Sequence, residues 1–337
     1  MAGTMRVLQG GLEPKSGRSA LEAAFDHFRL ERQGNLVSPA TLENYDFMVR
    51  PFLSWLAVQH PEVRGFPELT VPVVRAYRAE LATRCRKDGQ PLEPATIFDA
   101  HRAIGTFFRW ARAEGYEVDP RLLELARPKV PKKEPTLFHI SRLREVLEAC
   151  NPDVPQEALA VRILIGSGVR ASELCGLAVS APDGLSDLIL DSMDRGRVEL
   201  RVRWDAGAKG RKSRRVPVTP KLAAAIKRYE ARQRLDGKTG ALLVNQLGRP
   251  YKRYGIDAIM DRLERRVGFR VHAHAFRHTF ATVATQLGWN FERLRAAMGH
   301  EEYSTLQRYV RLATEIDLGP RADWTDLIAA NPALEWL

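Results

Sequence analysis

A proline-rich, basic segment divides this chain of 337 residues. It runs Arg127-Pro-Lys-Val-Pro-Lys-Lys-Glu-Pro135. Proline inside a helix removes a hydrogen bond and clashes with the preceding turn, and several prolines together favour an extended chain. The sequence therefore predicts a linker at 119–135, with one folded domain at 18–118 and a second one from 136 onward. The length suits two domains of ordinary size.

The part before the linker has the periodicity of helices. Apolar residues recur at helical spacing from residue 21 to 28, and again from 42 to 56. Ser38 followed by Pro39 is typical of a helix start. Third and fourth helices are expected near 72–85 and 97–111. We expect a compact four-helix domain whose apolar stripes form its core.

Helices alternate with a short strand pair after the linker. Strands are expected at 197–204 and 214–218, joined by a turn at 207–211. Helices are expected at 139–150, 156–165, 220–235, 254–267, 275–287 and 291–298. The stretch 178–198 is irregular, so the pattern does not define strand boundaries there. The predicted fold class is mainly α with a small antiparallel β-sheet.

The composition favours a polyanionic partner. The formal net charge is +11 and the hydrophobic fraction is 45%, which is typical of a globular protein that binds nucleic acid. The three cysteines are far apart and show no metal-ligand spacing, so we expect reduced thiols in a cytoplasmic protein and no metal. No apolar run approaches the roughly 20 residues that cross a bilayer, so no membrane partner is expected.

The last third of the chain holds residues suited to cutting a phosphodiester. That reaction needs a nucleophile, cations for the phosphate oxygens, a proton acceptor and a proton donor. His274 and Arg277 lie three apart on a predicted helix, so both project from one face, whereas the neighbouring His278 is expected to point elsewhere in a structural role. His300 follows a glycine, and Tyr309 comes nine residues later as the candidate nucleophile, with Tyr303 as its close competitor.

A second cation is expected earlier in this domain. Arg170 follows Ser167-Gly168-Val169, and the glycine allows a sharp turn before a new helix. Arg170 would then lie near the N-terminus of that helix, where peptide donors also favour an anion. Glu173, three residues on, shares its face and is expected to orient it.

The predicted turn between the strands is strongly basic. Lys209 lies between Ala208 and Gly210 and is the candidate proton donor, with Lys212 as its rival. The remaining cations near the turn and in the linker are expected to attract DNA phosphates. These candidate DNA-binding residues are Arg211, Lys212, Arg214, Arg215, Lys129, Lys132 and Lys133. An ordinary charged linker explains the last three equally well.

Taken in this order, the motifs resemble the catalytic domain of tyrosine recombinases, the phage-integrase and Xer-like family. The resemblance covers about 136–316, within a catalytic domain expected at 136–318, and implies that the N-terminal helices form a SAM-like core-binding domain. It implies that Arg170, Lys209, His274, Arg277 and His300 surround a scissile phosphate. Tyr309 would attack that phosphate to form a 3′-phosphotyrosine, without metal, ATP or any cofactor.

The same resemblance implies how the protein works on DNA. Four protomers would act on two sites in double-stranded DNA through a Holliday junction, in integration, transposition or dimer resolution; accessory proteins cannot be deduced. The tail at 319–337 is amphipathic and aromatic, and either docks on a neighbouring protomer or packs on its own domain. Two alternatives remain open: a type IB topoisomerase-like enzyme that relaxes DNA, and a non-catalytic DNA-binding regulator. A metal-dependent nuclease would need clustered carboxylates, which the sequence lacks.

Overall fold

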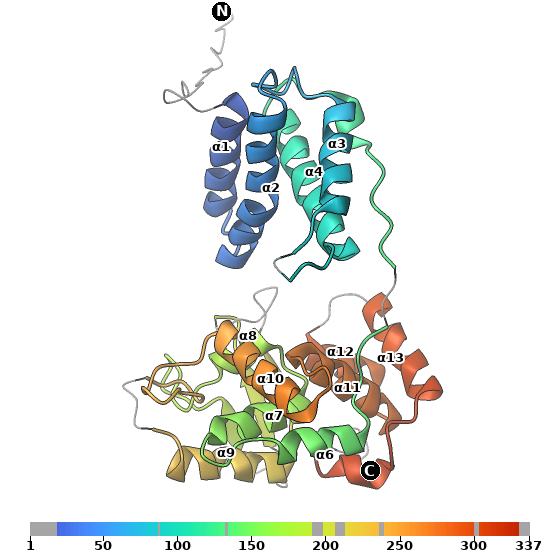
Figure 1. Ribbon diagram of the computed structural model, residues 1–337. Coiled ribbons are helices and arrows are strands. Elements are labelled where there is room, and N and C mark those ends of the chain that lie inside the picture. The colour runs from blue at the N-terminus through green and yellow to red at the C-terminus, as the bar shows by residue number, and fades with distance from the viewer. Residues whose placement is uncertain are drawn as a thin grey trace, which may run out of the picture. The chain divides into compact units, whose positions relative to one another are not determined.

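The structure is a computed structural model that describes residues 19–86, 88–131, 134–190, 198–205, 213–235, 239–299 and 303–329, and only the backbone of 303–305. The chain separates into two compact units, Met1–Lys133 and Glu134–Leu337 (Figure 1). The division falls within the segment 119–135, where the sequence predicts a linker. Each unit has its own hydrophobic core, so each is described by itself.

The N-terminal unit consists of helices around a core rich in phenylalanine. Its described helices are α1 (Ala20–Gly34), α2 (Pro39–Gln59), α3 (Val71–Thr83), α4 (Pro94–Ala113) and α5 (Pro120–Leu123). The first four match the predicted helices. Helix α5 lies within 119–135 and was not predicted. Its Leu122 is buried in the core of this unit, so the start of that segment packs with the N-terminal helices.

Local signals begin the first two helices where the sequence predicts. The Ser19 hydroxyl accepts a hydrogen bond from the backbone N–H of Glu22, and the Glu22 carboxylate accepts one from the backbone N–H of Ser19. Ser38 caps α2 by accepting from the N–H of Thr41. These reciprocal bonds satisfy N–H groups that have no partner inside the helix. The capped helices can therefore bury their phenylalanine faces against one another.

The C-terminal unit surrounds two buried helices. Its described elements are α6 (Ile140–Glu148), α7 (Pro155–Ser167), α8 (Ala171–Gly176), β1 (Leu188–Leu190), β2 (Val198–Val202), β3 (Arg214–Pro217), α9 (Pro220–Arg232), α10 (Arg253–Val267), α11 (Ala273–Gln286), α12 (Phe291–Met298), α13 (Tyr303–Glu315) and α14 (Arg321–Thr325). Helix α11 packs against α7, α12 and α13. Most of the side chains of α7 and α11 are buried, so these two helices form the centre of the unit.

A small antiparallel sheet lies in the order β1-β2-β3. Leu188, Leu200 and Val216 are aligned across the three strands and are all buried, so one face of the sheet packs on the core. The sequence predicted β2 and β3. It did not predict β1, because the strand has only three residues and lies in the irregular stretch 178–198.

The junction between α7 and α8 is a left-handed turn at Gly168. Its φ is +62°, and a Cβ at this position would lie 2.3 Å from the ring of Phe280, so only glycine fits. The turn makes Arg170 the N-cap residue of α8. The predicted placement of Arg170 at a helix N-terminus is therefore confirmed.

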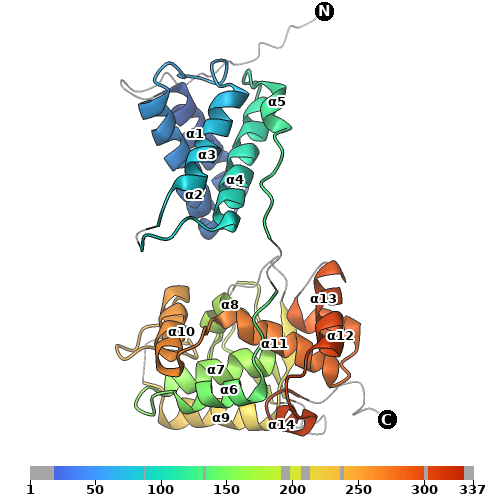
Figure 2. The same ribbon diagram turned by 45° about the vertical axis from the view of Figure 1, so that its right-hand side comes forward.

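The described part of the C-terminal tail packs on its own unit. Trp324 and Ile328 are fully buried in the same core as α7 and α11. The indole N–H of Trp324 donates to the carbonyl of Leu318, and that of Trp289 donates to Ala329. Figure 2 shows α14 beside α9, whose first turn meets it through the ion pair of Lys221 with Asp326. Residues 330–337, which the exchange hypothesis also concerns, lie outside the described residues.

Candidate functional site

Helix α11 carries three polar side chains at the centre of the candidate site. His274 is exposed, His278 is partly exposed, and Arg277 is only 1% exposed. His272 caps the N-terminus of the helix, and its ring nitrogen accepts a hydrogen bond from the N–H of Ala275. This cap fixes the first turn, so the side chains of the following turns emerge in defined directions.

The Arg277 guanidinium is held by backbone carbonyls of two other segments. Its Nη1 donates to the carbonyl of Gly168 at 2.6 Å, and its Nη2 donates to that of Met298. Burial, with a further contribution from the positive charge of Arg170, lowers the pKa of Arg277 to about 9. The side chain is therefore still cationic at neutral pH. Two arginines that repel each other in this way form a site that favours an anion.

Arg170 is oriented by the carboxylate of Glu173, as the sequence predicts. The Arg170 Nη1 donates to Glu173 Oε1 at 2.8 Å, and its backbone N–H donates to Oε2 at 2.8 Å. The Glu173 side chain is completely buried, whereas that of Arg170 keeps 21% exposure. Arg170 is thus fixed at one side and accessible at the other.

Arg214 lies in a different place from the one the sequence suggested. We expected it to attract DNA phosphates, but its side chain is only 10% exposed and forms a two-pronged ion pair with Glu173, at 2.9 and 2.7 Å. A basic run looks the same in sequence whether a given arginine faces solvent or the interior. Burial alone would raise the pKa of Glu173, but the hydrogen bonds and charges of Arg214 and Arg170 lower it to about 2. Glu173 is therefore an anion that joins two arginines.

The three arginines converge on one helix end. Arg214 Nε donates to the carbonyl of Ala297 at 2.6 Å. Arg277 donates to the next carbonyl, that of Met298, and Arg170 Nη2 approaches the one after it, that of Gly299, at 3.4 Å. These are the last carbonyls of α12, which have no partner inside the helix and carry its negative dipole end. The C-terminus of α12 therefore positions the cations of the site, and Figure 2 shows α12 beside α11 and α13.

Gly299 allows this convergence. It ends α12 with a φ of +61°, and a Cβ built on it would lie 3.2 Å from the Arg214 guanidinium carbon. Any side chain there would strain the backbone and push Arg214 away from the helix end.

The hydroxyl of Tyr309 meets an imidazole that the sequence analysis set aside. Tyr309 belongs to α13, is 2% exposed, and lies 2.8 Å from Nδ1 of His278. The expectation that His278 points elsewhere was therefore wrong. His278 follows His274 by one helical turn, so the two rings lie on the same face, edge to face at 4.6 Å. That spacing is the signal that would have found it.

The electrostatics keep both partners of this bond neutral. Burial raises the pKa of Tyr309, although the charges of Arg277, Arg308 and Arg170 oppose the increase. Burial and then the charges of His274, Arg308 and Arg277 lower the pKa of His278 to about 3. At neutral pH the phenol is therefore protonated, and the imidazole is neutral with a lone pair that can accept a hydrogen bond.

Other predicted site residues lie on the surface or outside the described ranges. Arg215 is next to Arg214 in β3 but its side chain is 66% exposed, and Lys129 is also exposed. Lys132, Lys133, Lys209, Arg211, Lys212 and His300 lie outside the described residues, as does the side chain of Tyr303. Their roles stay predictions.

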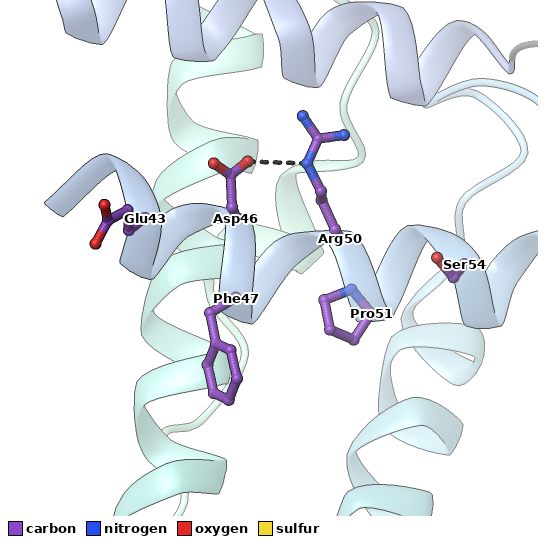
Figure 3. Close-up of a pocket in the computed structure, with 6 residues that line it drawn as sticks. All are labelled: Glu43, Asp46, Phe47, Arg50, Pro51 and Ser54. Carbon is purple, nitrogen blue, oxygen red and sulfur yellow. Dashed lines mark hydrogen bonds and ion pairs between the residues drawn. The ribbon is translucent and has the colours of Figure 1, made fainter. Parts of the chain in front are cut away.

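A depression on the N-terminal unit has different chemistry. Figure 3 shows its lining on α2, where Arg50 bonds to Asp46. Arg50 also pairs with Asp26, and Glu43 adds another carboxylate beside the exposed Phe47. A surface that is acidic and apolar does not suit a phosphate.

The described residues show neither of two other kinds of functional feature. They contain no group of three or more histidine, cysteine or acidic side chains placed to hold a metal ion. None of their helices combines the length and the apolar character that crossing a membrane requires.

Comparison with known proteins identifies relatives over most of the chain. Residues 137–315 match the model of the phage integrase family. The tyrosine recombinase XerA of Thermococcus onnurineus is 29% identical over 282 residues, which cover 82% of this chain and 86% of that protein. The tyrosine recombinase XerC of Nitrobacter winogradskyi is 28% identical over 305 residues, covering 86% and 88%.

Solved structures share the fold. One is the XerH site-specific recombinase bound to palindromic difH substrate in a post-cleavage complex, with a TM-score of 0.63, 18% identity, and coverage of 87% of this chain and 82% of that one. Another is the Tn1549 transposon integrase in complex with circular intermediate DNA, with a TM-score of 0.63, 18% identity, and coverage of 87% and 95%. At this identity the likeness concerns the fold alone.

Proposed function

Because this chain belongs to the phage integrase family and is a tyrosine-type site-specific DNA recombinase, we propose that it cuts and rejoins double-stranded DNA through a 3′-phosphotyrosine on Tyr309. The observation that carries this proposal is the convergence of Arg170 and Arg277 beside α13, the helix that bears Tyr309. Two fixed cations next to a buried phenol are what attack on a phosphodiester requires.

Arg170 and Arg277 bind the non-bridging oxygens of the scissile phosphate in this proposal. Charge builds on those oxygens as the tyrosine attacks, so cations already fixed by Glu173 and by the carbonyls of Gly168 and Met298 stabilise the transition state more than the ground state. The exposed imidazole of His274 lies at the open side of α11, where it can bond to the same phosphate.

The remaining predicted residues supply protons and further phosphate contacts. Lys209 donates a proton to the leaving 5′ oxygen, with Lys212 as its rival, and His300 contacts the phosphate. Arg211, Arg215, Lys129, Lys132 and Lys133 bind the DNA backbone, which makes the affinity depend on salt. The N-terminal helical unit acts as the core-type DNA-binding domain.

The phosphotyrosine link retains the energy of the broken bond. A 5′ hydroxyl from a second duplex then reverses the reaction, so neither ATP nor a metal is required. Four protomers on two DNA sites exchange strands in this way through a Holliday junction. The related proteins solved with difH substrate or with circular intermediate DNA support DNA as the partner.

A covalent trapping assay tests the proposed function. The protein is incubated with nicked duplexes from the DNA that flanks its own gene, in EDTA, and products are run on denaturing gels. We expect a protein–DNA adduct that disappears in Tyr309→Phe, because phenylalanine keeps the ring but lacks the nucleophilic oxygen. DNA binding by Tyr309→Phe, measured by gel shift, is the control for folding.

The other outcomes contradict parts of the proposal. An adduct that persists in Tyr309→Phe would show that another residue, first of all Tyr303, is the nucleophile. Relaxation of any supercoiled plasmid without a specific site would favour a type IB topoisomerase-like enzyme. Binding without any adduct on any duplex would indicate a non-catalytic regulator.

A further inference from the structure

His278 is the described imidazole in direct contact with the hydroxyl of Tyr309. Its Nδ1 lies 2.8 Å from the oxygen, which is hydrogen-bonding distance. The bond joins the buried helix α11 to the buried face of α13, which packs against it. Both side chains are thus held in place by the core rather than by solvent-exposed contacts.

The direction of this hydrogen bond follows from the protonation states. Burial favours the neutral form of both groups, so the phenol carries a proton and the imidazole carries only one. If Nδ1 carried that proton, Nδ1 would donate the hydrogen bond and the phenol oxygen would accept it. The cations Arg277, Arg308 and Arg170 favour electron density on the phenol oxygen, and therefore favour the arrangement in which the hydroxyl donates to Nδ1.

His274 is less suited to take the phenolic proton. It lies one turn before His278 on α11 and is the more exposed of the two rings. The two rings meet edge to face with centroids 4.6 Å apart, while the centroid of the His278 ring lies 5.7 Å from that of Tyr309. His278 thus lies against both His274 and the tyrosine, which leaves His274 for the phosphate.

We propose that His278 is a catalytic residue of this recombinase: its Nδ1 accepts the proton of the Tyr309 hydroxyl during strand cleavage and returns it during rejoining. The inference rests on the function proposed above. The sequence pattern alone gives His278 no role in the reaction, because it assigns the chemistry to His274 and Arg277.

The step balances as follows. The Tyr309 oxygen forms a bond to phosphorus while its proton moves to Nδ1 of His278, which becomes an imidazolium with protons on both nitrogens. The bond from phosphorus to the 5′ oxygen breaks, and that oxygen takes a proton from the general acid, for which Lys209 is the candidate. In rejoining, the 5′ hydroxyl attacks phosphorus and returns its proton to the same general acid. The bond from phosphorus to the Tyr309 oxygen breaks, and the imidazolium returns its proton to that departing oxygen.

The DNA phosphate makes this transfer easier. In the free protein the groups that act on His278 are mostly cationic or potentially so: His274, Arg308, Arg277 and His272. A phosphate bound by Arg277 and Arg170 would offset their charge and stabilise an imidazolium nearby. Proton acceptance would therefore be coupled to correct DNA binding.

A change in the acidity of the nucleophile tests the inference. Tyr309 is replaced by 2,3,5-trifluorotyrosine, whose phenol is more acidic and needs less help from a base. His278→Asn keeps an oxygen near the Nδ1 position that accepts the hydrogen bond but cannot take a proton; His278→Gln is the second variant. The rate of adduct formation on a nicked duplex is measured for each combination at saturating protein.

We expect His278→Asn to slow adduct formation by about 100-fold or more with ordinary tyrosine, in the range typical of a general base. With the fluorinated tyrosine the deficit should fall to several-fold. His274→Asn is the comparison: its deficit should be the same with either phenol, because a phosphate contact does not depend on phenol acidity.

Three other results would overturn the inference, and they are distinguishable. Adduct formation by both His278 variants at the wild-type rate would exclude the role while leaving the proposed function intact. A deficit that fluorination does not reduce would make His278 a positioning residue only. Failure of the unsubstituted protein itself to form any adduct would remove the proposed function, and the inference with it.

Discussion

Two glutamates in the C-terminal unit are buried and paired in the same way, but the arginines that pair with them come from different parts of the fold. Each lies in the first turn of a helix, Glu157 in α7 and Glu173 in α8, and each side chain is completely buried. Each accepts a backbone N–H, from Asn151 or from Arg170 itself, and each pairs with two arginines. Burial alone would raise the pKa of each carboxyl, but the hydrogen bonds and charges around it lower the pKa instead: the N–H of Asn151 and then the arginines for Glu157, and chiefly Arg214 for Glu173.

The difference lies in the origin of the arginines. Glu157 is bonded by Arg262 and Arg266, which are one turn apart on α10 and about a third exposed. This cluster fastens α10 to the start of α7. Glu173 is bonded by Arg170 and Arg214, which come from α8 and β3 and also reach the carbonyls at the end of α12. The same ion pairing joins two helices in one place and positions the cations of the candidate active site in the other.

Removing one arginine from each cluster should separate the two roles most strongly. Arg170→Ala is expected to slow adduct formation on nicked DNA by about 1,000-fold, because a fixed cation for the phosphate oxygens is lost. Arg262→Ala is expected to change the rate by less than about threefold, since its cluster touches none of the candidate catalytic side chains. Equal losses of activity in the two variants would break the comparison.

Removing each acid should affect stability unequally. Glu173→Gln leaves Arg214 and the partly exposed Arg170 without their buried anion, and is expected to lower the free energy of unfolding by about 3 kcal/mol at pH 7. Glu157→Gln should cost about half as much, because Arg262 and Arg266 can be solvated. Amide hydrogen exchange of α7 and α11 measures the stability of this unit alone.

The same measurement at low pH gives the sign of the Glu173 contribution. The pKa of Glu173 falls from an ordinary value near 4.5 to about 2 in the folded protein. Its ion pairs therefore add stability above about pH 4.5, and this stability is lost as the pH falls towards 2. The difference between the natural protein and Glu173→Gln should be full at pH 7 and mostly gone near pH 2. A constant difference would mean that the charge of Glu173 is not what stabilises the unit.

Adjacent arginines in β3 provide the smallest and finest test. Arg214→Ala is expected to slow adduct formation by about 10- to 100-fold with unchanged DNA affinity, since it acts by positioning Glu173 and thereby Arg170. Arg215→Ala is the matched control: its side chain is exposed and its nearest acid, Glu199, is 3.5 Å away. As a proposed contact to the DNA backbone it should weaken DNA affinity, but at saturating protein it should leave the rate of adduct formation within about twofold. A loss of DNA affinity in Arg214→Ala that equals its loss of rate would restore the simple phosphate contact that the sequence suggested.

The sequence predicted those parts of the molecule that depend on local chemistry. The helix start at Ser38 and the turn at Gly168 follow from hydrogen-bonding and steric rules that act over a few residues. The pair of Arg170 and Glu173 was found for the same reason, because both belong to one turn of α8.

Prediction from the sequence failed where side chains meet across the fold. Arg214 meets Glu173 from 41 positions away, and nothing in a basic run distinguishes the arginine that turns inward. Strand β1 is too short for its pattern to show. His278 was a different kind of error, because its one-turn spacing from His274 was visible and placed both rings on one face.

The end of α12 has a consequence for how accurately the cations are spaced. Three consecutive peptide carbonyls, from Ala297 to Gly299, each receive one arginine. Neighbouring peptide units are separated by a fixed covalent distance, about 3.8 Å between α-carbons. The covalent geometry of one short segment thus sets the spacing of the three guanidinium groups, although the three arginines belong to three different elements. If a core substitution shifts α8, β3 or α11 slightly, the long arginine side chains can adjust to the shift. Their guanidinium groups then stay bonded to the same three carbonyls.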